Sequence, residues 1–110
     1  MNMTFDKYEF SEPTQIAKWE PPESAGLYVI LKPDLYSSPV PLKPIYFGQT
    51  GNFAERGFIK SHKKYPDWIE EAREIDNLFI AIYLMPDSTE EERKAIESKL
   101  INMYHPVCND

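Results

Sequence analysis

The sequence predicts a small α+β domain with a three-stranded antiparallel sheet flanked by helices. Three observations support this prediction. The chain has 110 residues, enough for one domain with one modest core. Short apolar runs rich in β-branched and aromatic residues occupy residues 26–32, 45–48 and 78–84. Helical patterns follow the second and third runs, so the expected order is strand, strand, helix, helix, strand, helix.

The first two strands are expected to form a long hairpin. GLYVILK (26–32) and IYFG (45–48) are the two arms. Prolines recur in the connection at residues 33–44, where they should stiffen the loop and end each strand. Residues 1–23 are expected to be an N-terminal extension that packs on a domain formed by residues 24–110.

Two helices are expected between the second and third strands. Asn52 followed by Glu55 is typical of a helix N-terminus, although Gly57 lowers the helical propensity. That helix would carry Phe53, Arg56, Ile59 and Lys60. Pro66 suits the first position of the next helix. The inward residues of that second helix would be Trp68, Ile69 and Ala72.

The last helix is the clearest one in the sequence. Ser88 with Glu91 predicts its start, and the pattern continues to about Tyr104. Its apolar stripe would consist of Ile96, Leu100 and Met103.

The charge distribution argues against loose, charge-driven binding to nucleic acid. The net charge is −6, so a polyanionic partner would have to meet a local basic patch. One segment offers such a patch: Arg56, Lys60, Lys63 and Lys64 stand against Glu55 alone. The single cysteine, the lack of an apolar stretch of membrane-spanning length and the lack of a leader-like N-terminus favour a cytoplasmic protein without a membrane partner.

Several residues could carry chemistry, and each has an ordinary structural alternative. Tyr28 and Tyr46 could be plain sheet residues, because tyrosine favours strands. Glu97 could be a half-exposed helix carboxylate paired with Arg93, four residues earlier. His62 and the other histidine lack the spacing of a zinc site. The stretch GQTG lacks the GK[ST] of a phosphate-binding P-loop.

The order of these features resembles the GIY-YIG nuclease domain. The matching stretches are GLY at 26–28, YFGQT at 46–50, Arg56, and RKAIESKLINMYHPVCN at 93–109. The resemblance covers about residues 24–109. Leu27 and Phe47 stand where the family has isoleucine, which removes no functional group. Loop 33–44 is wider than the family usually shows, which bears on substrate access.

The resemblance implies a GIY-YIG-like fold and a set of site residues. It implies that Tyr28, Tyr46, Arg56 and Glu97 are catalytic. Tyr28 would be the general base, Tyr46 its orienting partner and Arg56 the phosphate-binding cation. Glu97 would hold one Mg²⁺ or Mn²⁺ ion. The nucleic-acid contacts would come from Gly48, Lys60, His62, Lys63, Lys64 and Asn109.

The expected function is therefore metal-dependent endonuclease activity on nucleic acid, with DNA favoured over RNA. Two alternatives stay open at this point. The first is a catalytically silent module on the same scaffold that binds nucleic acid or protein, which the acidic composition favours. The second is a small-molecule phosphoesterase, for which the sequence offers no base-recognition motif. A protein partner or a homodimer is compatible with each of these functions.

Overall fold

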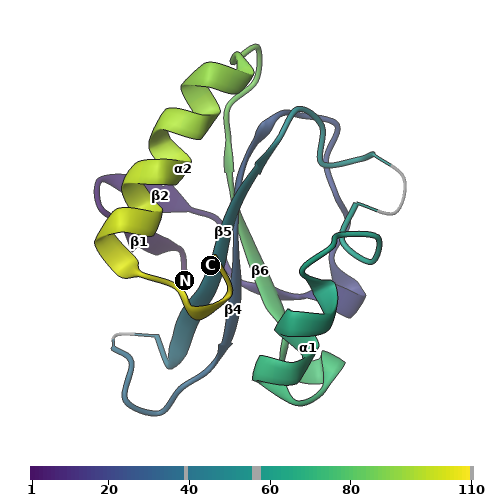
Figure 1. The fold of residues 1–110 in the computed structure, drawn as a ribbon, viewed down its shortest axis with the longest axis vertical. Coiled ribbons are helices and arrows are strands. Elements are labelled where there is room, and N and C mark those ends of the chain that lie inside the picture. The colour runs from purple at the N-terminus through teal and green to yellow at the C-terminus, as the bar shows by residue number, and fades with distance from the viewer. Residues whose placement is uncertain (39, 56–57, 110) are drawn as a thin grey trace.

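The computed structural model describes residues 1–38, 40–55 and 58–109. In these ranges the chain forms one α+β domain with a four-stranded antiparallel sheet, a separate two-stranded hairpin and two α-helices. The hairpin and α2 lie over one face of the sheet, and α1 lies over the other (Figure 1). The elements are β1 (Met3–Phe5), β2 (Tyr8–Phe10), β3 (Thr14–Gln15), β4 (Gly26–Pro33), β5 (Leu42–Thr50), α1 (Tyr65–Ala72), β6 (Phe79–Leu84) and α2 (Glu90–Tyr104).

The sheet has the strand order β3-β6-β4-β5, so β4 is central and β5 lies at an edge. The first six residues of β4 are all buried, because helices or the hairpin cover both faces of the sheet. In the β4–β5 hairpin, Tyr28 lies opposite Gly48 and Ile30 lies opposite Tyr46. Residues directly opposite one another share a face. This register therefore brings the two tyrosines to the same side of the sheet.

The sheet has one strand more than the sequence predicted. The two-residue strand β3 pairs with β6 through Thr14 and Gln15, and residues 3–10 form the β1–β2 hairpin. Both hairpin arms of the main sheet are also longer than expected, so their connection is residues 34–41 instead of 33–44. The prolines at positions 33 and 44 are accommodated inside strands, and a register shift follows Ile30.

The helix predicted from Asn52 is not formed in the described residues before α1. Asn52 instead accepts a hydrogen bond from the Ala54 backbone N–H at 2.9 Å, and a series of turns follows. The side chain thus satisfies the backbone locally in place of a helix. Arg56 and Gly57 lie outside the described residues. The next helix, α1, agrees with the prediction, with Pro66 in its first turn and Trp68 and Ala72 buried.

The last helix differs from the prediction in its cap and its stripe. Thr89 and Glu92, one residue later than expected, form the reciprocal capping box. Of the predicted stripe, Leu100 is buried but Met103 is 49% exposed. Arg93, which was not part of the predicted stripe, is also buried. No helix in the described residues has the length and apolarity needed to cross a membrane.

Two separate cores lie on the two faces of the sheet. The core under α1 contains Tyr28, Ile30 and Trp68. The core under α2 and the hairpin contains Leu27, Phe47 and several further apolar residues. Alternation sends neighbouring residues of β4 into different cores. In β5 the register shift breaks the alternation, and Ile45 and Tyr46 both lie on the α1 face. The site described next is built on the α1 face.

Candidate active site

Tyr28 and Tyr46 lie side by side on the α1 face of the sheet. Their ring centroids are 6.1 Å apart, and the ring planes are inclined to each other by 32°. Gly48 makes this arrangement possible. A Cβ at Gly48 would stand 2.3 Å from Cζ and 2.4 Å from the hydroxyl oxygen of Tyr28. The ring of Tyr28 therefore lies directly over the glycine backbone, which explains why the strand carries glycine at this position.

His62, from the turn segment before α1, completes the group. Its Nδ1 accepts a hydrogen bond from the Lys64 backbone N–H at 3.0 Å. In the neutral ring the proton must then be on Nε2, which lies 3.4 Å from the hydroxyl oxygen of Tyr46. The imidazole also packs on Trp68 with ring centroids 4.7 Å apart. Backbone and aromatic contacts thus fix both the tautomer and the orientation of His62.

Burial shapes the ionisation of this group. It raises the pKa of Tyr28 well above its ordinary value, and the charges of Tyr46 and Glu97 add to the rise. Burial and Glu97 also raise the pKa of Tyr46, while the hydrogen bond from Tyr28 acts in the opposite direction. The pKa of His62 is lowered by burial and then by Lys63 and Lys64. The neutral histidine is therefore the favoured form at neutral pH.

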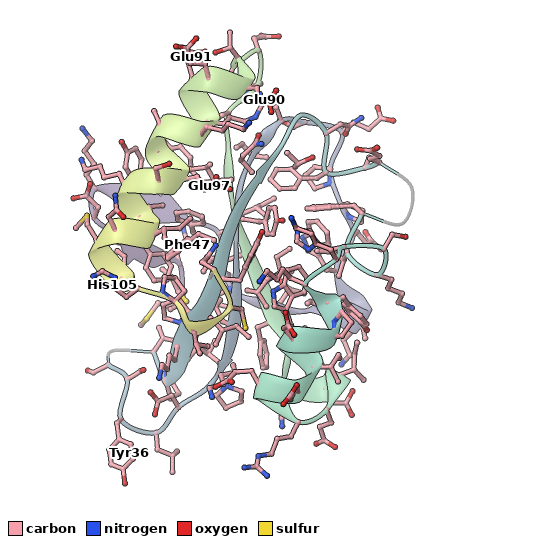
Figure 2. The ribbon with its side chains drawn as sticks, viewed as in Figure 1. Tyr36, Phe47, Glu90, Glu91, Glu97 and His105 are labelled. Atoms are coloured by element: carbon pink, nitrogen blue, oxygen red, sulfur yellow. The ribbon has the colours of Figure 1, made fainter. Side chains whose placement is uncertain are left out.

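Glu97 lies in the middle of α2, on the side that faces β5 (Figure 2). Although α2 packs on the opposite face from the tyrosines, β5 is an edge strand. The charge of Glu97 contributes to the raised pKa of both phenols. Glu97 is half-buried, and burial raises its pKa while Lys94 lowers it. The alternative pairing with Arg93 is absent, because the guanidinium of Arg93 binds Gln49 and Ser88 instead.

Glu97 fits a divalent ion that keeps most of its water. Across the described residues no group of three or more histidine, cysteine, aspartate or glutamate side chains could hold a metal. Mg²⁺ commonly binds proteins through one or two carboxylates and retains several waters. Within the same residues Glu97 has neither an ion pair nor a hydrogen bond, so its oxygens are available to such an ion.

A hollow of about 290 Å³ opens beside the tyrosine–histidine group. Its walls come from β4, from the end of β5 and from the turn segment before α1. They are Tyr28, Gln49, Thr50, Glu55, Phe58, Ser61 and His62. Hydroxyl, amide, imidazole and carboxylate groups meet there, which is a suitable mixture for binding a polar substrate.

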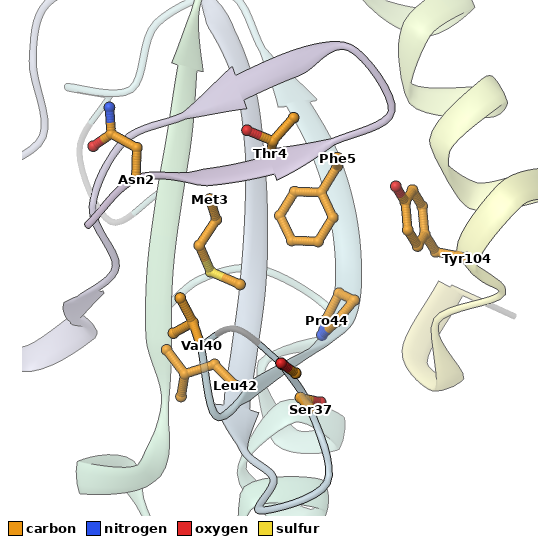
Figure 3. A pocket seen from close by; sticks show the side chains of 10 residues that line it. Asn2, Met3, Thr4, Phe5, Ser37, Val40, Leu42, Pro44 and Tyr104 are labelled. Carbon is orange, nitrogen blue, oxygen red and sulfur yellow. The ribbon is translucent and has the colours of Figure 1, made fainter.

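A second hollow, of about 400 Å³, lies between β1, the β4–β5 connection and the end of α2 (Figure 3). Its described lining is mostly apolar, with Met3, Phe5, Val40 and Leu42 prominent. None of the described lining residues is acidic, basic or a histidine. The hollow beside Tyr28, by contrast, is lined by Glu55 and His62.

The other residues that the sequence suggested as nucleic-acid contacts do not line the hollow beside Tyr28. Lys60 and Lys63 are exposed near the hollow, and Lys64 lies 3.9 Å from the carboxylate of Asp67. The Asn109 amide is engaged with the backbone of Phe47: its Oδ1 accepts from the N–H, and its Nδ2 donates to the C=O, each at 2.9 Å. Asn109 therefore fastens the chain end to β5. Arg56 lies outside the described residues.

Sequence reasoning overlooked Gln49 and the burial of Arg93. Gln49 directly follows the glycine of the YFGQT stretch and lines the hollow. Arg93 is 6% exposed, and its Nε donates to Gln49 Oε1 at 2.9 Å. The spacing in the sequence could have predicted this burial. Arg93 stands three residues before Ile96 and seven before Leu100, which places it on the packed face of α2.

Comparison with protein-family models, with curated proteins and with solved structures gives no match for this chain. The site geometry described above is therefore the basis for assigning a function.

Proposed function

We propose that this protein is a metal-dependent endonuclease that hydrolyses phosphodiester bonds, with DNA favoured over RNA. One observation carries the proposal. Two neighbouring tyrosines and an oriented neutral histidine lie beside an open hollow, and the charge of a half-buried glutamate raises the pKa of both phenols. These residue types also occupy the matching positions of the GIY-YIG pattern. The two lines of support, sequence order and spatial proximity, are independent of each other.

Glu97 is the residue that would hold the ion, one Mg²⁺ or Mn²⁺. When bound, such an ion supplies Lewis-acid stabilisation of charge on the phosphoryl oxygens. The pKa of Glu97 is raised by burial, which means that the isolated carboxylate is poorly solvated in its charged form. A cation beside it relieves this penalty, which is a physical reason for a metal at this position.

Two observations favour Tyr46 over Tyr28 as the residue whose phenolate, formed when its own proton passes to solvent, would accept a proton from the attacking water. Tyr28 is 2% exposed, and its pKa is raised further by its neighbours. Tyr46 is only half-buried, and its oxygen lies 3.4 Å from Nε2 of His62. Hydrogen bonds to an anion favour its formation. We therefore assign proton acceptance to the phenolate of Tyr46, with His62 as a donor to its oxygen.

A catalytically silent nucleic-acid or protein-binding module on the same scaffold is the second candidate. The net charge of −6 favours it, because most phosphate-binding surfaces gain affinity from positive charge. Intact side chains at the tyrosine, histidine and glutamate positions favour the enzyme over this module.

The decisive experiment measures nicking of supercoiled plasmid with Mg²⁺ or Mn²⁺. Glu97→Gln should lose metal-dependent cleavage while remaining folded. The matched control is Glu91→Gln, which makes the same change on an exposed part of α2 (Figure 2) and should cleave like wild type.

Wild-type protein that fails to cleave DNA or RNA with either metal would favour the silent module. Cleavage retained in Glu97→Gln would remove Glu97 from the proposed site, since the amide cannot replace the carboxylate as a metal ligand of equal charge.

A further inference from the structure

A second hollow with aromatic walls, of about 210 Å³, adjoins the hollow beside Tyr28, and we call it the aromatic hollow. The two hollows share Glu55 and Phe58 as lining residues. The ring of Phe58 also packs edge-to-face on Tyr28, with ring centroids 4.9 Å apart. A group bound in the aromatic hollow would therefore lie next to the candidate active site. The described lining is Ile16, Trp19, Pro21, Phe53, Glu55, Phe58, Ile59 and Lys60.

Three aromatic rings meet in the aromatic hollow and differ in exposure. Phe53 is fully buried, whereas Trp19 and Phe58 are only partly buried. The ring centroid of Trp19 lies 6.0 Å from that of Phe53 and 6.3 Å from that of Phe58, at interplanar angles of 89° and 75°. Neither phenylalanine ring therefore stacks in parallel with the indole, and part of the indole stays exposed. A planar ligand can stack on Trp19 without replacing a ring that is already stacked there.

Trp19 comes from the N-terminal extension, whose backbone is fastened beside β6. The Ile16 N–H donates to the Leu78 C=O at 3.0 Å, and the Ile16 side chain is buried. At the end of the 3₁₀ turn Ile16–Lys18, the Trp19 N–H donates to the Ile16 C=O at 3.3 Å. The indole is thus held in place before a ligand arrives, which lowers the entropy cost of binding.

The rim of the aromatic hollow carries one group of each charge. Glu55 and Lys60 are exposed, and in the described part of the chain neither forms an ion pair. Lys60 can bind a backbone phosphate. Glu55 repels phosphate but accepts a hydrogen bond from an amino group on a base edge. Aromatic walls with this rim therefore favour a nucleobase inside the hollow and the sugar–phosphate backbone outside it.

We propose that the aromatic hollow binds one unpaired nucleobase of the substrate, stacked on Trp19, beside the phosphodiester at the candidate active site. The inference rests on the proposed nuclease function and narrows its substrate to nucleic acid that is single-stranded or locally unpaired. A base within a duplex could enter only after it leaves the helix, which costs free energy. Stacking also supplies affinity that does not depend on positive charge, which suits a chain of net charge −6.

The first test measures the affinity of Trp19→Leu for a fluorescein-labelled 12-nucleotide single strand of mixed sequence, by anisotropy without metal. Leucine keeps an apolar side chain against Phe53 but offers no planar face. The affinity should fall about fivefold or more, the loss expected for one stacked base. Trp19→Phe keeps a ring and should lose less affinity than Trp19→Leu. The matched control is Tyr8→Leu, which removes a partly buried ring from the α2 face and should bind like wild type.

Intrinsic fluorescence gives a second test that does not depend on how well Trp19→Leu folds. The chain has two tryptophans, and Trp68 is fully buried. Saturating unlabelled single strand should quench the emission of wild type, because a base stacks on Trp19, and should leave the emission of Trp19→Phe unchanged. The same 12-nucleotide sequence in a labelled blunt duplex should bind wild type about fivefold more weakly or less tightly still.

The outcomes distinguish this inference from the proposed function. Wild type that neither binds nor cleaves nucleic acid contradicts both. Single-strand binding that depends on Trp19, without cleavage of any substrate, contradicts the nuclease proposal alone. Unchanged affinity in Trp19→Leu, or equal affinity of wild type for duplex and single strand, overturns the inference alone.

Two further results would also overturn it. An equal loss of affinity in Tyr8→Leu would assign the effect to general destabilisation. Wild-type emission that does not change at saturation, or an equal quench in Trp19→Phe, would leave the aromatic hollow to another occupant, such as an apolar side chain of a protein partner.

Discussion

Both faces of the sheet are rich in aromatic rings, but the rings differ in whether they carry a polar group. On the α2 face, Phe5 packs edge-to-face on Phe10 and on Phe47, with ring centroids 5.5 and 5.3 Å apart. These rings carry no polar atom. On the α1 face, the rings of Tyr28 and Tyr46 have centroids 6.1 Å apart, and both carry hydroxyl groups. The centre of the α2 face thus packs phenylalanine rings, whereas the α1 face packs tyrosine rings beside the imidazole of His62.

The contrast is sharpest between two neighbours on one strand. Phe47 and Tyr46 are adjacent in β5 and point to opposite faces. The chain can thus keep a polar, partly open site on one side because the other side supplies a separate apolar core. Stability and chemistry should respond to different mutations, which the following substitutions test.

Phe47→Ala should have the largest effect on stability. Phe47 is 1% exposed at the centre of the α2-face core. Truncation of a buried phenylalanine costs about 3–5 kcal/mol in free energy of unfolding. Urea denaturation monitored by circular dichroism measures this loss.

Tyr46→Phe is the matched change on the other face. It keeps the ring and removes the hydroxyl, so the loss of stability should be about 1 kcal/mol or less. Single-turnover cleavage should fall about a hundredfold or more, as expected when a general base is lost. A larger destabilisation from Tyr46→Phe than from Phe47→Ala would reverse the comparison of the faces.

Gly48→Ala should have an intermediate effect. The added Cβ would overlap the Tyr28 ring, and overpacking of this kind costs about 1–3 kcal/mol. The control is Gly51→Ala, where the nearest atom to a new Cβ is Arg93 Nη2 at an ordinary 3.5 Å. Thermal melts of the two variants provide the measurement. Equal melting temperatures would mean that Tyr28 can leave its place over Gly48 at little cost.

The smallest effect concerns pH. The folded state lowers the pKa of His62 below its ordinary 6.5, so the unfolded state binds the proton more tightly. Stability contributed by neutral His62 is present above about pH 6.5 and is lost as pH falls toward the folded pKa. His62→Asn keeps an acceptor for the Lys64 N–H but cannot titrate. Its urea midpoint should therefore change less between pH 7 and pH 5 than that of wild type, and an identical change would assign the titration to another group.

Much of this architecture could be predicted from local patterns. The apolar runs located β4, β5 and β6, and Pro66 located the start of α1. The runs also predicted the β4–β5 hairpin, and the register seen in the structure makes Tyr28 and Tyr46 neighbours. These features depend on residues close together in the sequence, where propensity and periodicity act directly.

The missed features depend on contacts between distant segments. Strand β3 has two residues, too few for any periodic pattern, and exists because Thr14 and Gln15 pair with β6. Arg93 is buried because Gln49 and Ser88 accept its hydrogen bonds. The turn at Asn52 replaced a plausible helix because a side-chain hydrogen bond competed locally.

The amide of Asn109 has one further consequence. β5 is a long edge strand, and the outward N–H and C=O of such a strand invite pairing with another chain. Asn109 occupies both of these groups at Phe47 with one side chain, as a neighbouring strand would. Asn109 therefore opposes edge-to-edge aggregation. It blocks the backbone groups of Phe47 within β5, so an incoming strand would not find a continuous series of free N–H and C=O groups there.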